Sequence, residues 1–433
     1  MADREPDGGP CLALLRRLIA AGRDGETAVL AEVASVAVAA GGRVEQVAYE
    51  PATVPLVGEF AAQPMMPAGQ RTALVVRFPG SGHGRSLLAF AHPDSEPPHG
   101  LDAWRFDPFA GTVADGRVYG WGVADDLAGV AIMLTAAQQA TRGRHLAGDL
   151  ILAATPSKRN ARGIAALLHR GVRADAALYI HPAESGAGLN EIKAFTAGQL
   201  EFRVVVRGEA PATSEPHQTG FAHRGVSAID KAMALAAALR ELDGARAARV
   251  RHPVLEGAVG RSTNLMISHL AGGAADALSR FPDRCVLGAA LSFPPGEALE
   301  AVQAEVEQAL RQACRHDDWL AAHPPELIWD TGVSGAETSL DHPFYQIASN
   351  ALGRVGVQPR LNPMHTGSDI RNPIIQCGIP TIGLGPLCGD LAQNGRRDEW
   401  VDVADLGNAV AVTGAVMAAW SGSRGERDYG GSA

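Results

Sequence analysis

Hydrophobic residues recur along the chain with two different spacings, which predicts alternating helices and strands. Helical spacing covers residues 10–21, 26–40 and 125–141. Short apolar runs typical of buried strands cover residues 43–50, 71–78, 85–92, 148–155 and 176–182. Because strands separated by helices usually form a mainly parallel sheet with both faces covered, we expect an α/β fold.

A different pattern begins near Gly198. Residues 199–208, 262–273 and 283–293 have the spacing of strands, and residues 225–242 and 295–315 that of long amphipathic helices. This order predicts a small α+β layer with an antiparallel sheet, and the α/β pattern returns from about residue 320. We therefore predict an α/β domain in two parts, 1–197 and 319–422, an inserted domain at 198–318 and a disordered polar tail at 423–433.

Composition narrows the classes of function. The 433 residues have a net charge of −9 without blocks of like charge, which argues against nucleic acid and anionic membrane partners. The five cysteines are scattered and form no Cys-x-x-Cys pair, as expected in a reducing cytoplasm. No uninterrupted apolar run approaches the length of a membrane span, and the first residues lack a signal pattern.

Three turns that follow predicted strands contain residue types able to bind a metal. His92 ends the strand at 85–92 and Asp94 follows it, Asp125 begins the helix at 125–141, and His181 lies at the end of the strand at 176–182. Two histidines and one carboxylate suit zinc or a similar divalent ion. From these residues alone, a loop histidine and a carboxylate that caps a helix are equally good interpretations.

Longer motifs resemble a known family. "AHPD", "WRFDPFAGTVADGRVYGWGVADD", "FPPGE", "HTGSDIRN", "GIPTIGLGP" and "DEWVDVADL" occur in this order over nearly the whole chain. The sequence resembles the di-zinc amidohydrolases and peptidases that include aminoacylase, carboxypeptidase G, acetylornithine deacetylase and succinyl-diaminopimelate desuccinylase. The resemblance implies a zinc-exopeptidase-like α/β domain, an inserted lid domain that forms a homodimer, and two zinc ions bridged by one aspartate.

Matched residue by residue, the resemblance preserves one of the two metal positions. It implies that His92 is a ligand, that Asp94 orients its ring, and that Asp125 is the bridging aspartate. His181 stands where the family has a Glu or Asp. These residues predict one zinc-like ion per chain, or none.

The other metal position has lost its family residues. The family's Glu-Glu turn, which supplies a general base and a ligand, aligns with Ser157 and Lys158. The last family histidine falls within residues 391–400, where no histidine occurs. The lid arginine aligns with Ser292, and either His217 or His223 is the lid histidine.

The substitution at residue 158 has a direct electrostatic consequence. Two unit charges about 4 Å apart interact by about 4 kcal/mol at an effective dielectric constant near 20, so an ammonium group repels a nearby cation. One hypothesis is that Lys158 occupies the space of the lost ion and pairs with Asp125. The alternative is that Lys158 points to solvent.

The remaining candidates concern proton transfer and substrate binding. Ser157 with Lys158 makes a weak dyad, because adjacent residues in an extended segment point in opposite directions. Asp126, Glu184 and His365 are possible substitute bases. Arg162, His365 and Arg371 are candidate residues for binding an anionic substrate.

Three functions stay open. The first is a divergent enzyme acting on an amino-acid-like or acylated small molecule with one metal ion or none, as in a biosynthetic pathway. The second is a binding protein without activity on the same scaffold. The third, an ordinary metal-dependent amide hydrolase, requires a Glu pair that residues 150–171 do not contain.

Overall fold

The computed structural model describes residues 9–142, 146–182, 186–363, 368–389 and 398–422. The chain divides into two compact units, which are described separately. The first unit comprises the described parts of residues 1–57, 66–195 and 337–433, and the second comprises residues 58–65 and 196–336.

A six-stranded sheet forms the centre of the first unit. Its strands, in spatial order, are β1 (Arg43–Tyr49), β3 (Arg71–Phe78), β7 (Leu150–Ala154), β4 (Leu87–Ala91), β8 (Ala176–Ile180) and β17 (Thr381–Leu384). Strands β7, β4, β8 and β17 are parallel, whereas β1 and β3 pair in antiparallel fashion. The expected α/β fold with a mainly parallel sheet is therefore confirmed.

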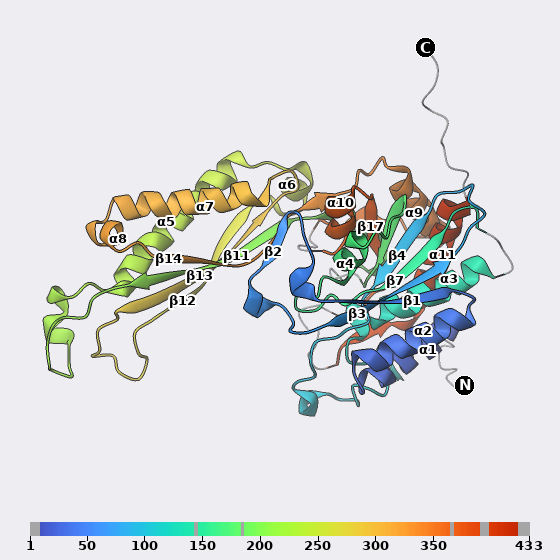
Figure 1. The fold of residues 1–433 in the computed structure, drawn as a ribbon, viewed down its shortest axis with the longest axis horizontal. Helices are drawn as coiled ribbons and strands as arrows, with labels where there is room; N and C mark the ends of the chain where they lie inside the picture. The colour runs from blue at the N-terminus through green and yellow to red at the C-terminus, as the bar shows by residue number, and fades with distance from the viewer. Residues whose placement is uncertain (1–8, 143–145, 183–185, 364–367, 390–397, 423–433) are drawn as a thin grey trace, which may run out of the picture. The chain divides into compact units, whose positions relative to one another are not determined.

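Helices cover both faces of this sheet, as Figure 1 shows. One layer contains α1 (Gly9–Gly22), α2 (Glu26–Ala39), α3 (Ala128–Thr141), α9 (Pro343–Arg354) and α11 (Val403–Gly422). The other contains α4 (Gly163–His169) and α10 (Arg371–Cys377). Side chains alternate along β4, so Leu87 and Ala89 join the first core and Leu88 and Phe90 the second. Both faces are apolar because both are covered.

Helix α11 is long and apolar enough to cross a membrane by length and composition alone. Leu406, Val410, Val416 and Met417 of this helix are buried in the core of the first unit. This packing is that of a core helix in a folded domain.

The second unit is built on a five-stranded antiparallel sheet. Its strands, in spatial order, are β12 (Asn264–Gly272), β13 (Arg284–Phe293), β11 (Gly198–Arg207), β14 (Glu326–Val333) and β2 (Glu59–Ala61). Helices α5 (Ala228–Arg249) and α7 (Leu299–Arg315) pack together and contact this sheet, and the short helices are α6 (Pro253–Val259) and α8 (Asp318–Ala322). The α+β character expected for this part of the chain is present.

The second unit extends further than the predicted 198–318. Strand β14 pairs with β11 along most of its length, so the unit continues to Ala336. Strand β2, from the first 65 residues, pairs with β14 in turn. Both pairings join distant segments, which the spacing of hydrophobic residues within one segment does not reveal.

Candidate active site

The carboxyl ends of the adjacent parallel strands β7, β4 and β8 bring the candidate residues together. His92 directly follows β4, His181 directly follows β8, and Ser157 and Lys158 lie in the turn after β7. The amide of Thr155 donates to the carbonyl of Ala91 (3.0 Å), which continues the pairing of β7 and β4 up to this turn. Chemistry in open α/β sheets is usually found at this edge.

Asp125 lies at the centre of the cluster, just before α3. The preceding turn is held by the buried carboxylate of Glu399, which accepts hydrogen bonds from the amides of Gly122 (3.0 Å) and Ala124 (2.6 Å). Gly122 adopts φ +70°, a left-handed conformation that favours glycine. Glu399 was not among the predicted site residues, although its "DEWV" segment was part of the resemblance.

Two cationic or polar groups contact the carboxylate of Asp125. Lys158 donates to Oδ1 through its ammonium group, and Nε2 of His181 lies 3.2 Å from the same oxygen. Burial opposes ionisation of Asp125, but Lys158 and His181 outweigh it and hold the pKa of Asp125 well below its usual range. The same pairing raises the pKa of Lys158 despite its burial, so Lys158 is a fixed cation. Lys158 therefore points into the protein rather than to solvent.

Both ring nitrogens of His92 lie close to an oxygen atom. Nδ1 lies 2.7 Å from the carbonyl of Thr155, and Nε2 lies 3.1 Å from Oδ2 of Asp369. Burial alone would lower the pKa of His92, but the carboxylate of Asp369 raises it above its usual value. His92 thus forms an ion pair with a carboxylate from another part of the chain.

Asp369 is a site residue that the sequence analysis missed. Besides its ion pair with His92, it accepts hydrogen bonds from Ser157 Oγ (2.7 Å), Arg371 Nη1 (3.0 Å) and Asn372 Nδ2 (3.0 Å). Burial opposes its ionisation, but His92 and Arg371 hold the pKa of Asp369 below its usual range. The sequence signal for Asp369 is its position in "HTGSDIRN", the motif that also contains the predicted candidates His365 and Arg371.

Asp94 has a different role from the one expected. Its carboxylate accepts hydrogen bonds from the amides of Ser157 (2.9 Å) and Lys158 (2.8 Å), and Arg71 lies 3.3 Å away. The partner of the His92 ring on the Nδ1 side is the Thr155 carbonyl, so Asp94 does not orient that ring. Asp94 instead holds the turn that positions Lys158.

Ser157 and Lys158 point to different partners. Ser157 Oγ donates to Asp369, whereas Lys158 donates to Asp125. The two side chains therefore do not act as a nucleophile and base pair in this arrangement, as the opposed directions of adjacent residues suggested.

Lys193 is a second buried lysine that the sequence analysis missed. It follows β9 (Glu191–Ile192), is 1% exposed, and its ammonium group reaches Nδ1 of His181 (2.9 Å). It also donates to the carbonyls of His181 (3.1 Å) and Pro182 (2.7 Å). A lone lysine in "NEIKAF" offers no motif, so the sequence pattern did not reveal it.

The structure places the candidate substitute bases and substrate-binding residues in different surroundings. Asp126 is fully buried and accepts hydrogen bonds from the amides of His92 (3.1 Å) and Gly129 (3.2 Å). Burial raises the pKa of Asp126 well above its usual range. Because the side chain is fully buried and bonded to two backbone amides, Asp126 is not an accessible base in this arrangement. Glu184 and His365 lie outside the described residues. Arg371 belongs to the cluster, whereas Arg162 donates to the Pro51 carbonyl (3.2 Å).

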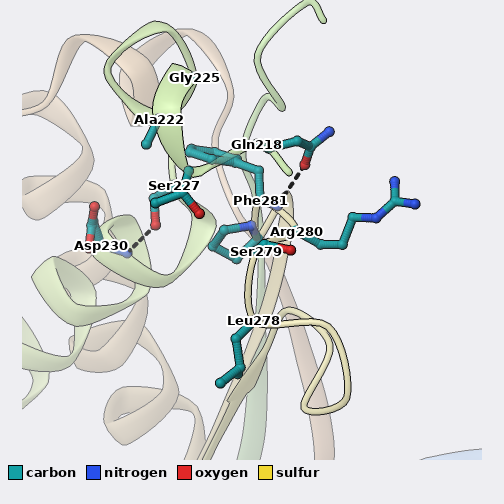
Figure 2. Close-up of a pocket in the computed structure, with 11 residues that line it drawn as sticks. Gln218, Ala222, Gly225, Ser227, Asp230, Leu278, Ser279, Arg280 and Phe281 are labelled. Carbon is teal, nitrogen blue, oxygen red and sulfur yellow. Dashed lines mark hydrogen bonds between the residues drawn. The ribbon is translucent and has the colours of Figure 1, made fainter. Parts of the chain in front are cut away.

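His217 and His223 belong to the second unit, where both are exposed. Nδ1 of His217 lies 3.1 Å from Ser279 Oγ. The adjacent loops enclose a pocket of about 310 Å³, in which the side chain of Gln218 accepts a hydrogen bond from the amide of Phe281 (Figure 2). The assignment of either histidine to the active site stays a prediction.

The donor set of the cluster does not fit a divalent ion. Within the described residues, no group of three or more His, Cys, Asp or Glu side chains is arranged to hold a metal. Each predicted ligand has a protein partner: Lys158 for Asp125, Lys193 for His181 and Asp369 for His92. Ammonium groups cannot ligate a metal, because they have donors and no acceptor.

Comparison with known proteins gives consistent matches. The model of peptidase family M20/M25/M40 matches residues 88–419. A succinyl-diaminopimelate desuccinylase from Methylobacterium radiotolerans is 29% identical, with 78% of this chain and 82% of the relative covered. An N-formyl-4-amino-5-aminomethyl-2-methylpyrimidine deformylase from Halalkalibacterium halodurans is 27% identical, with 74% of this chain and 76% of the relative covered.

Solved structures have the same fold. An M20 family metallo-carboxypeptidase from Sulfolobus solfataricus has a TM-score of 0.68 at 13% identity, covering 95% of this chain and 99% of the other. A dinuclear metal-binding peptidase of the M20 family from Bacillus subtilis has a TM-score of 0.59 at 16% identity, covering 94% and 99%. At these identities the likeness is one of fold.

Proposed function

Because the chain belongs to peptidase family M20/M25/M40, we propose that it acts on a small acylated amino acid or short peptide without a pair of divalent ions. The names of its relatives describe removal of a succinyl, formyl or acetyl group. The substrate class follows from that shared theme. The departure from paired ions follows from the cluster around Asp125.

The ion pair of Lys158 with Asp125 is the observation on which the proposal rests. The resemblance places Asp125 as the carboxylate that bridges two ions, and here that carboxylate already has an ammonium partner. A second charge about 4 Å from Lys158 would be repelled by about 4 kcal/mol per unit charge at an effective dielectric constant near 20. We therefore expect at most one zinc-like ion per chain.

The charges of the cluster suit an anionic substrate. Lys158 and Arg371 are fixed cations near the strand ends, and the charge of Lys158 is held in place by Asp125. A preorganised positive group of this kind stabilises negative charge that develops on a carbonyl oxygen. We assign this electrostatic role to Lys158 and the role of positioning Asp369 to Arg371.

A second candidate function is binding without turnover. Ser157 stands where the family has its general base, and loss of a general base commonly costs about 10²–10⁴ in rate. Asp126, the described candidate for a substitute, is occupied by two backbone amides. These two observations favour a binding protein on the same scaffold.

The first experiment measures binding and turnover together. Protein purified without chelators is tested against N-acetyl, N-formyl and N-succinyl amino acids and dipeptides by calorimetry and by mass spectrometry of products. Turnover that survives removal of zinc supports the enzyme, and binding without product supports the second candidate. Two zinc ions per chain, or neither binding nor conversion of any of these compounds, contradicts the proposal.

The second experiment tests the part played by Lys158. Lys158→Glu places a ligand beside Asp125, and elemental analysis after incubation with zinc should show one additional ion per chain. Arg159→Glu is the matched control, because Arg159 lies on the same turn but is exposed and pairs with Glu96 instead. An unchanged zinc count in Lys158→Glu would show that Lys158 does not exclude the ion.

Two further expectations concern the assembly and the compartment. We propose a cytoplasmic homodimer formed through the second unit, with a small molecule as the substrate. Light scattering of the full chain and of a variant with Met266→Glu on the exposed strand β12 tests the dimer. A monomeric mass for the unmodified chain would contradict it.

A further inference from the structure

Lysine is rare in this chain, and two of its lysines lie in the candidate active site. The sequence contains 38 lysine and arginine residues, of which only Lys158, Lys193 and Lys231 are lysines and the other 35 are arginines. Lys231 pairs with Asp317 in the second unit. Arginine therefore supplies nearly all positive charge, and lysine occurs where a compact ammonium group contacts the predicted ligands.

The surroundings of Lys193 match the hydrogen-bonding capacity of an ammonium group. Its three N–H donors have three acceptors, namely the carbonyls of Pro182 (2.7 Å) and His181 (3.1 Å) and Nδ1 of His181 (2.9 Å). Gly383 leaves space for the aliphatic stem, because a Cβ there would lie 3.2 Å from the Cβ of Lys193. The backbones of the two residues also exchange hydrogen bonds (2.7 and 2.8 Å).

This arrangement determines which nitrogen of His181 bears the proton. Nδ1 of His181 lies 2.9 Å from both the Lys193 ammonium group and the Pro182 carbonyl. Because the ammonium group can only donate, Nδ1 acts as its acceptor and does not also donate to Pro182. The neutral ring then has its proton on Nε2, which lies 3.2 Å from Asp125 Oδ1 and donates to it. A metal bound at Nε2 would require the proton on Nδ1, directly facing an N–H of Lys193.

We propose that Lys193 is a positioning residue that keeps His181 in its Nε2–H form, so that His181 binds Asp125 and is withheld from a metal ion. The inference rests on the proposed function in one respect, the absence of paired ions. Lys158 pairs with the carboxylate of Asp125, and Lys193 fixes the position of the proton on the His181 ring. The two lysines thus act on neighbouring predicted ligands by different means.

Nuclear magnetic resonance of the full chain labelled with ¹⁵N-histidine tests this directly. The His181 signal is assigned by its loss in His181→Asn, and its nitrogen shifts distinguish the two neutral forms. The unmodified protein should show Nε2–H. Observation of Nδ1–H in the unmodified protein overturns the inference, whatever happens in the variants.

Lys193→Met supplies the second arm of the test. Without the ammonium group, His181 should change to Nδ1–H, donating to the Pro182 carbonyl that lies 2.9 Å away. Zinc affinity, followed through the His181 signal, should rise by about tenfold, the lower end of effects seen for groups behind a ligand. Lys231→Met is the control and should change neither the proton position on His181 nor the zinc affinity. Retention of Nε2–H in Lys193→Met contradicts the inference.

The outcomes separate this inference from the proposed function. If no acylated compound is bound or converted, the proposed function fails while the histidine signals still report on Lys193. If substrates are converted without zinc but His181 is Nδ1–H, the role of Lys193 is wrong and the proposed function stands.

Discussion

Removal of the charge of Lys158 is the most informative single perturbation of the cluster. Lys158→Met keeps a long side chain and leaves Asp125, whose side chain is only 16% exposed, without its ammonium partner. Removing one member of a buried ion pair typically destabilises a protein by about 3–5 kcal/mol, because the remaining charge is neither paired nor hydrated. We expect Lys158→Met to lower the free energy of unfolding by an amount in this range.

The magnitude follows from the geometry of the pair. At about 3 Å and an effective dielectric constant near 20, two unit charges attract by about 5 kcal/mol, and dehydration of both groups offsets part of this. Asp125→Asn in the same chain removes the stranded charge. The double variant should therefore be more stable than the sum of the two single losses predicts, by about 1–3 kcal/mol.

The pH dependence has a definite sign. Lys158 holds the pKa of Asp125 below its unfolded value, so the stabilisation is present above that unfolded value, about 3.9, and is lost as the pH falls toward the folded one. The difference in stability between the unmodified protein and Lys158→Met should accordingly be largest at neutral pH. It should shrink below about pH 4.

Hydrogen exchange measured by mass spectrometry is the appropriate assay, because peptides from β4 and β7 report on the first unit alone. Protection of these peptides in urea at pH 7 and pH 4 gives the free energy of opening. It is measured for the unmodified protein, Lys158→Met, Asp125→Asn and the double variant. Single losses that add within about 0.5 kcal/mol would refute the ion pair as a coupled unit.

Two further predictions concern polar contacts, one within each unit. Arg246 has a side chain that is 1% exposed and pairs with Glu297 and Glu305 (2.6 Å each). Arg246→Met should lower the free energy of unfolding of the second unit in urea by about 3 kcal/mol. Arg249→Met, at an exposed position, should lower it by at most about 1 kcal/mol. Equal losses would contradict the burial argument. Asp94→Asn should lower the free energy of unfolding of the first unit by about 2 kcal/mol and increase hydrogen exchange at the amides of residues 157 and 158. Unchanged exchange at these amides would show that Asp94 does not hold the turn.

Several parts of the site were predictable because they depend on local sequence. His92, Asp125 and His181 each follow or precede a strongly apolar segment, and adjacent parallel strands end at the same edge of the sheet. His92, Asp125 and His181 were found from their place relative to elements that the spacing of apolar residues defines. Lys158 was a candidate through the family resemblance, and the sequence left open whether it pairs with Asp125 or points to solvent.

Other parts were not accessible to the same reasoning. Asp369 reaches His92 and Ser157 from more than 200 residues away in the chain, and Glu399 reaches the turn before Asp125 from a similar distance. Strand β2 joins the second unit by the same kind of distant pairing. Such contacts depend on how the chain returns to a point in space, which no local pattern encodes.

By itself, the sequence determined the α/β layering and the existence of an α+β part, because each follows from residue type and spacing. The family resemblance added that Ser157 and Lys158 stand where acidic residues are expected. Only the tertiary structure decided the pairings of these residues. In the fold, Lys158 pairs with Asp125, the Lys193 ammonium group contacts His181, and Asp369 pairs with His92. The physical reason is that a buried charge must find a partner among whatever groups the fold brings within reach, and that choice is made in three dimensions.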